Sequence, residues 1–196
     1  MSRFTPRRGT RAAAVIAIML SSLVATFAPA PAAVPATSAA AIPRGRVAIG
    51  DSVMLGAAEE LRARGFRRVD AVVSRQFYSA DDVLRSYRRS GRLARNVVIA
   101  LGTNGTVTLQ QCHSAVAAAP HRAVFLVNNR VPRSWQARNN RVLGACAGDF
   151  GRVRLINWYR KSSGHPAWLT SDGYHLTSLG QRRYARLVDS QVDRVT

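Results

Sequence analysis

The fold is decided by the stretch RVAIGDSVMLG, which runs from Arg46 to Gly56. Its first residues form a short apolar run that is typical of a buried strand, and a helical pattern of apolar residues follows from Val53 to Arg64. Gly50 permits a tight turn between the two. The stretch therefore places the hydroxyl of Ser52 where a strand gives way to a helix.

The same succession of a β-branched run and a longer amphipathic run repeats along the chain. Strands are expected at Val47–Gly50, Arg68–Val73, Val97–Leu101, Ala123–Asn128 and Val153–Trp158. Helices are expected at Val53–Arg64, Ala80–Ser90, Thr108–Ala118, Ser134–Ala147 and Ser178–Asp193. This alternation predicts a three-layer α/β/α sandwich. With right-handed crossovers, its core is a flavodoxin-like, five-stranded parallel sheet of order 2-1-3-4-5.

The predicted strand order also says where a ligand binds. Strands 1 and 3 lie side by side, and their carboxyl ends form the crevice that binds ligands in open α/β sheets. Ser52 follows strand 1, and the turn Gly102–Gly105 follows strand 3. The segment Asp172–His175 follows strand 5 after a loop. We therefore expect three segments distant in sequence to meet at one edge of the sheet.

Residues 1–33 have the composition of a secretory signal peptide. Four arginines and no acid occupy Met1–Arg11, an apolar stretch continues to Ala28, and small residues suited to cleavage follow. Residues 34–43 form an Ala/Pro-rich linker, and residues 44–196 form one folded domain. We expect a secreted or extracytoplasmic protein. The alternative is that the apolar segment is retained as a membrane anchor.

The charge of the chain restricts its partners. The 29 basic and 10 acidic residues give a formal net charge of +19, and only four of the basic residues lie in the N-terminal segment. Such a charge attracts polyanions, which for an exported protein are anionic envelope polymers. No nucleic-acid-binding module is visible, so no nucleic acid is expected. The alternative is that the arginines only cover solvated helix faces.

The two cysteines, Cys112 and Cys146, predict a disulfide, because an even count in an exported chain is typical of one. The bridge would close a loop of about 35 residues and stabilise the fold by roughly 3–4 kcal/mol. The predicted strand order places the two helices that carry them next to each other. The alternative is a pair of free, buried thiols.

Ser52, His175 and Asp172 supply the groups that serine acyl chemistry needs. The imidazole of His175 can accept the proton of the Ser52 hydroxyl, and Asp172 can orient the ring from three residues away. The alternative is structural: Asp51 and Ser52 are good helix caps, and Asp172 could cap the last helix. No Cys/His/carboxylate cluster accompanies these residues, so neither a metal nor another cofactor is expected.

Asn104 lies in the turn Gly102-Thr103-Asn104-Gly105. Its side-chain amide is a suitable donor to the oxyanion of a tetrahedral intermediate, and the backbone N–H of Ser52 is another. The alternative is an asparagine that only suits a tight turn.

Together, Gly50-Asp51-Ser52, Gly102-Thr103-Asn104 and Asp172-x-x-His175 resemble the SGNH (GDSL-type) hydrolase family, over about residues 47–192. They are most similar to the extracytoplasmic SGNH domain that is fused to membrane acyltransferases such as peptidoglycan O-acetyltransferases. Further matching segments are Asp70-Ala71, Ser74-Arg75-Gln76, Asn129–Arg133 with Trp135, and Gly164-His165-Pro166.

The resemblance implies a role for each matching residue. Ser52 is the nucleophile, His175 the general base and Asp172 its orienting group, while Asn104 donates to the oxyanion. The wider family has a glycine whose N–H is a third oxyanion donor, and Ser74 stands at that position here. Trp168 and Tyr174 are candidate walls of the substrate pocket.

The resemblance implies an acyl-enzyme acting on short-chain esters, in particular O-acetyl groups of cell-envelope carbohydrate. The related transferases carry a multi-helix membrane domain that supplies the acyl group, and this sequence contains no such segment. Three routes stay open: hydrolysis, transfer from a separate membrane partner, and transfer from a soluble donor. The alternatives are a non-catalytic, basic wall-binding protein on the same scaffold and a lipase-like enzyme for long acyl chains.

Overall fold

The structure is a computed structural model that describes Met1 and residues 45–195. The predicted linker and, apart from Met1, the predicted signal peptide lie outside the described residues. The described residues 45–195 belong to one compact unit. In the part of the chain that the structure describes, no helix is long and apolar enough to cross a membrane.

A five-stranded parallel sheet is the centre of the domain, with the order β2-β1-β3-β4-β5 that the sequence predicts. The strands are β1 (Arg46–Gly50), β2 (Phe66–Ala71), β3 (Asn96–Ala100), β4 (Ala123–Val127) and β5 (Val153–Ile156). Every neighbouring pair is parallel. Strands β1 and β3 are adjacent in the middle of the sheet, so the chain departs from them in opposite directions.

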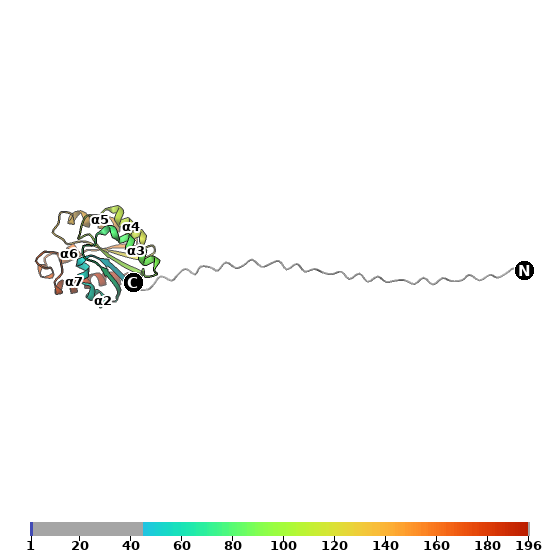
Figure 1. Cartoon of the computed structure of the whole chain (residues 1–196), viewed down its shortest axis with the longest axis horizontal. Coiled ribbons are helices and arrows are strands. Elements are labelled where there is room, and N and C mark those ends of the chain that lie inside the picture. Colours follow the sequence, from blue (N-terminus) through green and yellow to red (C-terminus); the bar gives the residue numbers. More distant parts are fainter. Residues whose placement is uncertain (2–44, 196) are drawn as a thin grey trace. The chain divides into compact units, whose positions relative to one another are not determined.

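Helices cover both faces of the sheet (Figure 1). One face packs against α3 (Ala80–Arg89), α4 (Leu109–Ala118) and α5 (Gln136–Gly148). The other packs against α1 (Ser52–Gly56), α2 (Ala58–Arg62), α6 (Trp158–Ser162) and α7 (Ser178–Asp193). Two short 3₁₀ turns, η1 (Phe77–Ser79) and η2 (Pro166–Trp168), complete the described elements.

The alternation of side chains along each strand produces these two layers. In β3, Val97 and Ile99 pack with the α3–α5 layer, whereas Val98 and Ala100 pack with the opposite one. All four are buried, so the central strand is apolar on both faces. Burial of each Val or Ile side chain is worth about 1.5–3 kcal/mol.

The structure corrects three predicted boundaries. The predicted helix Val53–Arg64 is two helices, because Ala57 N–H donates to Met54 O and this i→i−3 bond tightens the last turn of α1. Strand β2 ends at Ala71, and Val73 beyond it is 62% exposed. The predicted strand Val153–Trp158 ends at Ile156, because the next residue caps α6.

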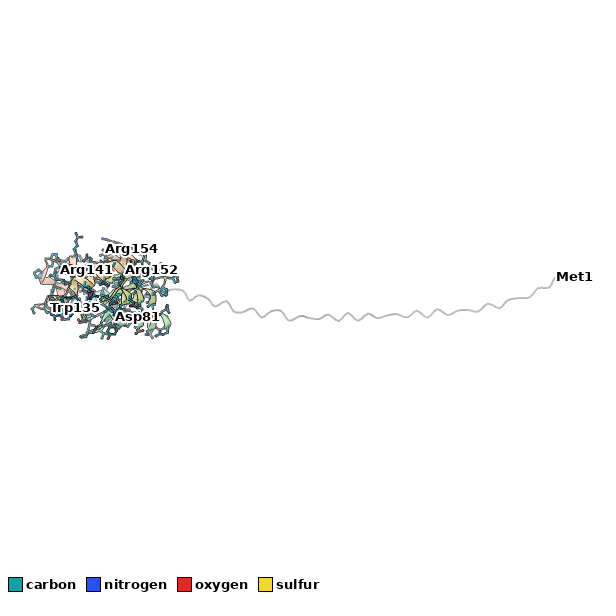
Figure 2. The ribbon with its side chains drawn as sticks, turned by 90° about the horizontal axis from the view of Figure 1, so that it is seen from above. Met1, Asp81, Trp135, Arg141, Arg152 and Arg154 are labelled. Atoms are coloured by element: carbon teal, nitrogen blue, oxygen red, sulfur yellow. A yellow bond between two sulfur atoms is a disulfide. The ribbon has the colours of Figure 1, made fainter. Side chains whose placement is uncertain are left out.

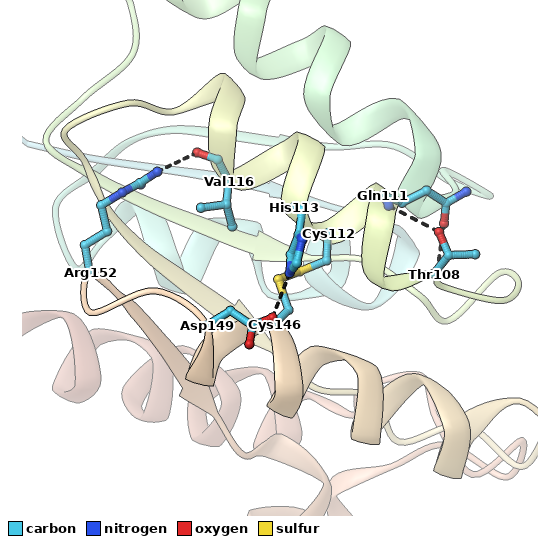
Figure 3. The surroundings of a disulfide bond; sticks show 8 residues. All are labelled: Thr108, Gln111, Cys112, His113, Val116, Cys146, Asp149 and Arg152. Atoms are coloured by element: carbon cyan, nitrogen blue, oxygen red, sulfur yellow. Dashed lines mark hydrogen bonds and ion pairs between the residues drawn. A yellow bond between two sulfur atoms is a disulfide. The ribbon is translucent and has the colours of Figure 1, made fainter.

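The predicted disulfide is present: Cys112 of α4 and Cys146 of α5 are bonded, with their Cα atoms 6.3 Å apart (Figure 3). His113, the residue after Cys112, lies with its Nε2 atom 2.7 Å from Oδ2 of Asp149, which directly follows α5. Arg152 donates to Val116 O at 2.9 Å near the end of α4. The disulfide and the contact between His113 and Asp149 thus join the ends of the helices that follow β3 and β4, and Arg152 joins α4 to the start of β5.

Candidate active site

Ser52 is the first residue of α1, directly beyond the carboxyl end of β1. Asp51 is the N-cap residue, and its Oδ1 accepts the N–H of Val53 at 3.0 Å. The cap leaves the Ser52 side chain free to point away from the helix, and its backbone N–H is one of the donors that a helix start cannot pair internally. The predicted capping role of Asp51 is therefore observed together with a partly exposed Ser52.

A relay of two hydrogen bonds links Ser52, His175 and Asp172. The Nε2 atom of His175 lies 3.0 Å from Ser52 Oγ, and its Nδ1 atom lies 2.7 Å from Asp172 Oδ2. Because an ionised carboxylate only accepts, Nδ1 carries the proton and Nε2 presents its lone pair to the Ser52 hydroxyl. The structure thus brings the three predicted residues within bonding distance of one another.

Asp172 is held in its ionised form by its own turn. Its Oδ1 accepts the N–H groups of Tyr174 and His175, each at 3.0 Å, and the hydroxyl of Thr170 at 2.7 Å. Partial burial raises the pKa of Asp172, but the bond from the His175 ring and these three bonds outweigh it, so the pKa lies below its usual range. Asp172 does not cap the last helix, because Thr177 does so through Gly180 N–H.

The turn that carries Asp172 and His175 is closed by backbone contacts. Leu169 and Leu176 form an antiparallel bridge, and Thr170 N–H donates to His175 O at 2.8 Å. Gly173 has a φ of 81°, a conformation that glycine adopts without strain. Gly173 therefore makes the reversal that turns both side chains to the same side.

Two loops beyond β2 and β3 carry the remaining predicted residues, Ser74 and Asn104. Asn104 Nδ2 donates to Arg75 O at 3.3 Å, which joins the two loops. Ser74 has a φ of 61°, the left-handed conformation natural to glycine, at a cost of roughly 1–2 kcal/mol for a serine. Ser74 thus adopts a conformation that a glycine would adopt without strain.

A pocket of about 350 Å³ lies against both loops, and its walls include Ser74, Gln76, Asn104, Arg133, Trp135 and Tyr174. Tyr174 also packs on the ring of His175, with centroids 4.2 Å apart. Trp168, the other candidate wall, is instead buried in the core, where it stacks on Trp158 and His165.

Asp70 holds the loop that carries Ser74. Arg75 donates to Asp70 O at 2.6 Å and to Asp70 Oδ1 at 2.8 Å, and Tyr87 donates to Asp70 Oδ2 at 2.5 Å. Burial raises the pKa of Asp70, but the bonds from Tyr87 and Arg75 lower it more. Burial and the contact with Asp70 raise the pKa of Tyr87 to about 12.

Asn139 of α5 holds the loop that carries Asn104, and the sequence analysis missed it. Its Nδ2 donates to Gly102 O at 3.0 Å and to Gly105 O at 2.8 Å, and its Oδ1 accepts Val107 N–H at 2.8 Å. A usable signal was present, because asparagine is a poor helix former and here it stands inside a predicted helix. No group of three His, Cys, Asp or Glu that could hold a metal ion occurs within residues 45–195.

The chain matches no protein-family model. It does match curated proteins. It is 34% identical over 149 residues to the peptidoglycan O-acetyltransferase OatA of Listeria monocytogenes serovar 1/2a, a match that covers 76% of this chain and 24% of the relative. It is 32% identical over 142 residues to the O-acetyltransferase OatA of Staphylococcus aureus, covering 71% of this chain and 24% of that protein. The chain thus spans about a quarter of the length of these curated relatives.

The fold is also that of a solved structure, the C-terminal catalytic domain of peptidoglycan O-acetyltransferase A from Streptococcus pneumoniae with a methylsulfonyl adduct. The TM-score is 0.70 at 22% identity, and the match covers 79% of this chain and 95% of that domain. With this fold and these relatives, the chain belongs to the SGNH (GDSL-type) hydrolase family. Its homologues within that family are peptidoglycan O-acetyltransferases.

Proposed function

We propose that this protein is an exported serine esterase or O-acyltransferase that acts on O-acetyl groups of cell-envelope carbohydrate through an acyl-enzyme. The observation that carries the proposal is the relay from Asp172 through His175 to Ser52, with bonds of 2.7 and 3.0 Å. A nucleophile, a base and an orienting group in this geometry are the arrangement of serine acyl chemistry.

In the proposed mechanism, Ser52 Oγ attacks the ester carbonyl carbon while its proton moves to His175 Nε2. The carbonyl oxygen, now negative, is bound by the backbone N–H groups of Ser52 and Ser74 and by the Asn104 amide. His175 then gives the proton to the departing sugar oxygen, which leaves the acetyl group on Ser52. Water or another sugar hydroxyl, deprotonated by His175, releases it as acetate or as a new ester.

The neighbouring pocket supports a carbohydrate as the substrate. Trp135 and Tyr174 offer aromatic faces for a sugar ring, and Arg133 brings a positive charge to the same wall. The Trp135 ring is fixed by a bond of 3.3 Å from its Nε1 to Thr103 O, beside Asn104. The homologous O-acetyltransferase of Listeria monocytogenes acts on peptidoglycan, a carbohydrate polymer of the cell envelope, which supports the same class of substrate.

One experiment separates the two outcomes of the acyl-enzyme. The purified protein is incubated with an acetyl ester, with and without a chito-oligosaccharide, and the products are weighed by mass spectrometry. An acetylated sugar means transfer, and free acetate alone means hydrolysis. Ser52→Ala should lower turnover by roughly 10³-fold or more, whereas Ser90→Ala, at an exposed serine beyond α3, should leave it unchanged.

A second candidate function is binding to anionic wall polymers without catalysis. The observation in its favour is the set of exposed arginines, including Arg141 of α5 and Arg154 of β5 (Figure 2). If the parent protein turns over no acetyl ester, or Ser52→Ala turns it over equally well, the enzymatic proposal is wrong. Salt-sensitive binding to wall polymer that survives Ser52→Ala would then describe the protein better.

A further inference from the structure

A small cavity lies behind the turn that presents Ser52. Its volume is about 10 Å³, and its walls include Asp51, Thr103, Asn129, Trp158 and Tyr184. These residues come from the ends of β1, β3 and β4 and from α6 and α7. The cavity shares only Thr103 with the pocket described above, and the proposed mechanism does not use it.

Three polar side-chain atoms in the walls of this cavity lack a hydrogen-bond partner among the described residues. They are Asp51 Oδ2, Asn129 Nδ2 and Trp158 Nε1. The three residues are only 1%, 5% and 1% exposed, respectively. Buried polar groups are nearly always paired, with protein or with ordered water, because leaving them unpaired is destabilising.

The size and chemistry of the cavity fit one water molecule. A cavity needs roughly 10–15 Å³ of this kind of volume, and two to four polar partners, to hold a water. The unpartnered groups of the walls are two N–H donors and one carboxylate acceptor. A water can accept from both donors and donate to the acceptor, whereas a cation would be repelled by the two N–H groups.

We propose that this cavity binds one structural water, which accepts from Trp158 Nε1–H and Asn129 Nδ2–H and donates to Asp51 Oδ2. We further infer that Asp51 is, through this water, a positioning residue for Ser52. The second part rests on the proposed function, because it concerns the nucleophile of that reaction. The first part does not depend on it.

The contacts of Asp51 show how the water acts on Ser52. The N–H of Asp51 donates to Ala100 O at 3.3 Å, its carbonyl accepts from Leu55 at 2.9 Å, and its Oδ1 accepts from Val53 at 3.0 Å. Only Oδ2 is left without a fixed partner. A water on Oδ2 ties the carboxylate to β4 and α6, so the whole turn that carries Ser52 is fixed at both carboxyl oxygens.

Burial raises the pKa of Asp51 above its usual range, although the polar groups of nearby Thr103, the hydrogen bond from Val53 N–H and the attraction of His175 act in the opposite direction. A further donor on Oδ2 favours the ionised form. The buried phenol of Tyr184, whose pKa is raised by burial and by Asp51, also lines the cavity and stays neutral.

The direct test is a high-resolution crystal structure of the protein. The expected result is one density peak in the cavity, at about 2.7–3.2 Å from each of the three unpartnered atoms. A cavity with no density, or side chains repacked so that the three atoms bond to one another, would overturn the proposal. This result is independent of any enzymatic activity.

The positioning role is tested by exchanging the polarity of two walls. With Asp51→Asn the water faces three donors but has only two lone pairs, so we expect a lower Tm and about a tenfold lower rate of Ser52 modification by a sulfonyl fluoride. The double variant Asp51→Asn/Asn129→Asp restores two donors and one acceptor, and it should recover most of both losses. The positioning role is wrong if Ser52 of Asp51→Asn is modified at the parent rate, or if the double variant recovers neither the Tm nor the rate of modification.

A matched pair of indole variants tests the third contact. Trp158→Phe removes the Nε1 donor, whereas Trp168→Phe makes the same change in the ring stacked on it, which does not line the cavity. We expect the greater fall in Tm, and the loss of the density peak, in Trp158→Phe alone. Equal effects of the two variants would contradict the proposed water. A parent protein that shows the peak but turns over no ester would refute only the proposed function.

Discussion

Asn139→Ala is the substitution whose effect can be worked out most fully from the structure. The side chain is fully buried and makes three hydrogen bonds of 2.8 to 3.0 Å with the backbone between Gly102 and Val107. Each such bond contributes about 1 kcal/mol, and partners left buried and unpaired cost more, so the free energy of unfolding should fall by about 3–5 kcal/mol. The free energy of unfolding of a typical domain is about 5–15 kcal/mol, so the variant should remain folded at low temperature.

The same substitution should also slow the reaction, because the freed loop carries Asn104. The side chain of Asn104 itself makes one hydrogen bond, of 3.3 Å, to Arg75 O on the loop that follows β2. Loss of an oxyanion donor lowers kcat by about 10²–10³-fold, and a donor that is loosened but still present should lower it by about 10-fold or more. The expected change is in kcat, with KM nearly unchanged.

The assay compares urea unfolding and acetyl-ester turnover with a stability-matched control. Removing the Cys112–Cys146 disulfide, which spans 34 positions, should cost about 4 kcal/mol in the chain-entropy model without touching the loop. Both proteins are measured at a temperature at which circular dichroism shows them folded. If Asn139→Ala loses no more kcat than the disulfide-free protein, the loop is not held by Asn139 in the way we describe.

Further predictions concern three other sites. Partial burial raises the pKa of Asp172, but hydrogen bonds from the His175 imidazole and from its own turn lower it by more. The pKa in the folded state therefore lies below the ordinary value of 3.8. Its stabilising effect is therefore present above that value and is lost as the pH falls, and the urea-measured stability gap between the parent and Asp172→Asn should shrink from about pH 6 to about pH 2. Tyr87, with a pKa raised from 10.0 to about 12, favours the fold below pH 10, an effect that is lost as the pH rises through about 12. Absorbance of tyrosinate should show a late step that Tyr87→Phe removes. A Cβ on Gly180 would overlap the Trp168 carbonyl, so Gly180→Ala should cost about 1–3 kcal/mol or more, seen as a lower Tm; an unchanged Tm would show that α7 can shift.

The sequence alone predicted the strand order of the sheet and the convergence of the segments that carry Ser52, Asn104 and His175 at one edge of it. Apolar periodicity reports which residues face a core, and the alternation of strand and helix then leaves few topologies. The expectation that Ser52 and the Asp172–His175 segment lie at one edge follows from that topology alone. The disulfide between α4 and α5 followed from the same strand order.

What the sequence did not predict are the groups that hold the loops. Asn139 bonds to backbone 32 to 37 positions away and Tyr87 bonds to Asp70 17 positions away, and no periodic pattern encodes such pairs. The start of α6 was missed for a different reason. Asn157 is a good cap, but the residues after it are aromatic and fit a strand as well as a helix, so that only the bond from Arg160 N–H to its side chain decides.

The turn between Leu169 and Leu176 has a consequence for how such a protein can change over evolution. All the bonds that orient Asp172 come from within that turn, and the turn is closed by its own bridge. The turn is therefore a self-contained unit that needs only a fixed attachment to the first turn of α7. The exposed residues 163–165, which lie between buried Ser162 and buried Trp168 in the connection from β5, can therefore change in number while the hydrogen bonds among Asp172, His175 and Ser52 stay intact.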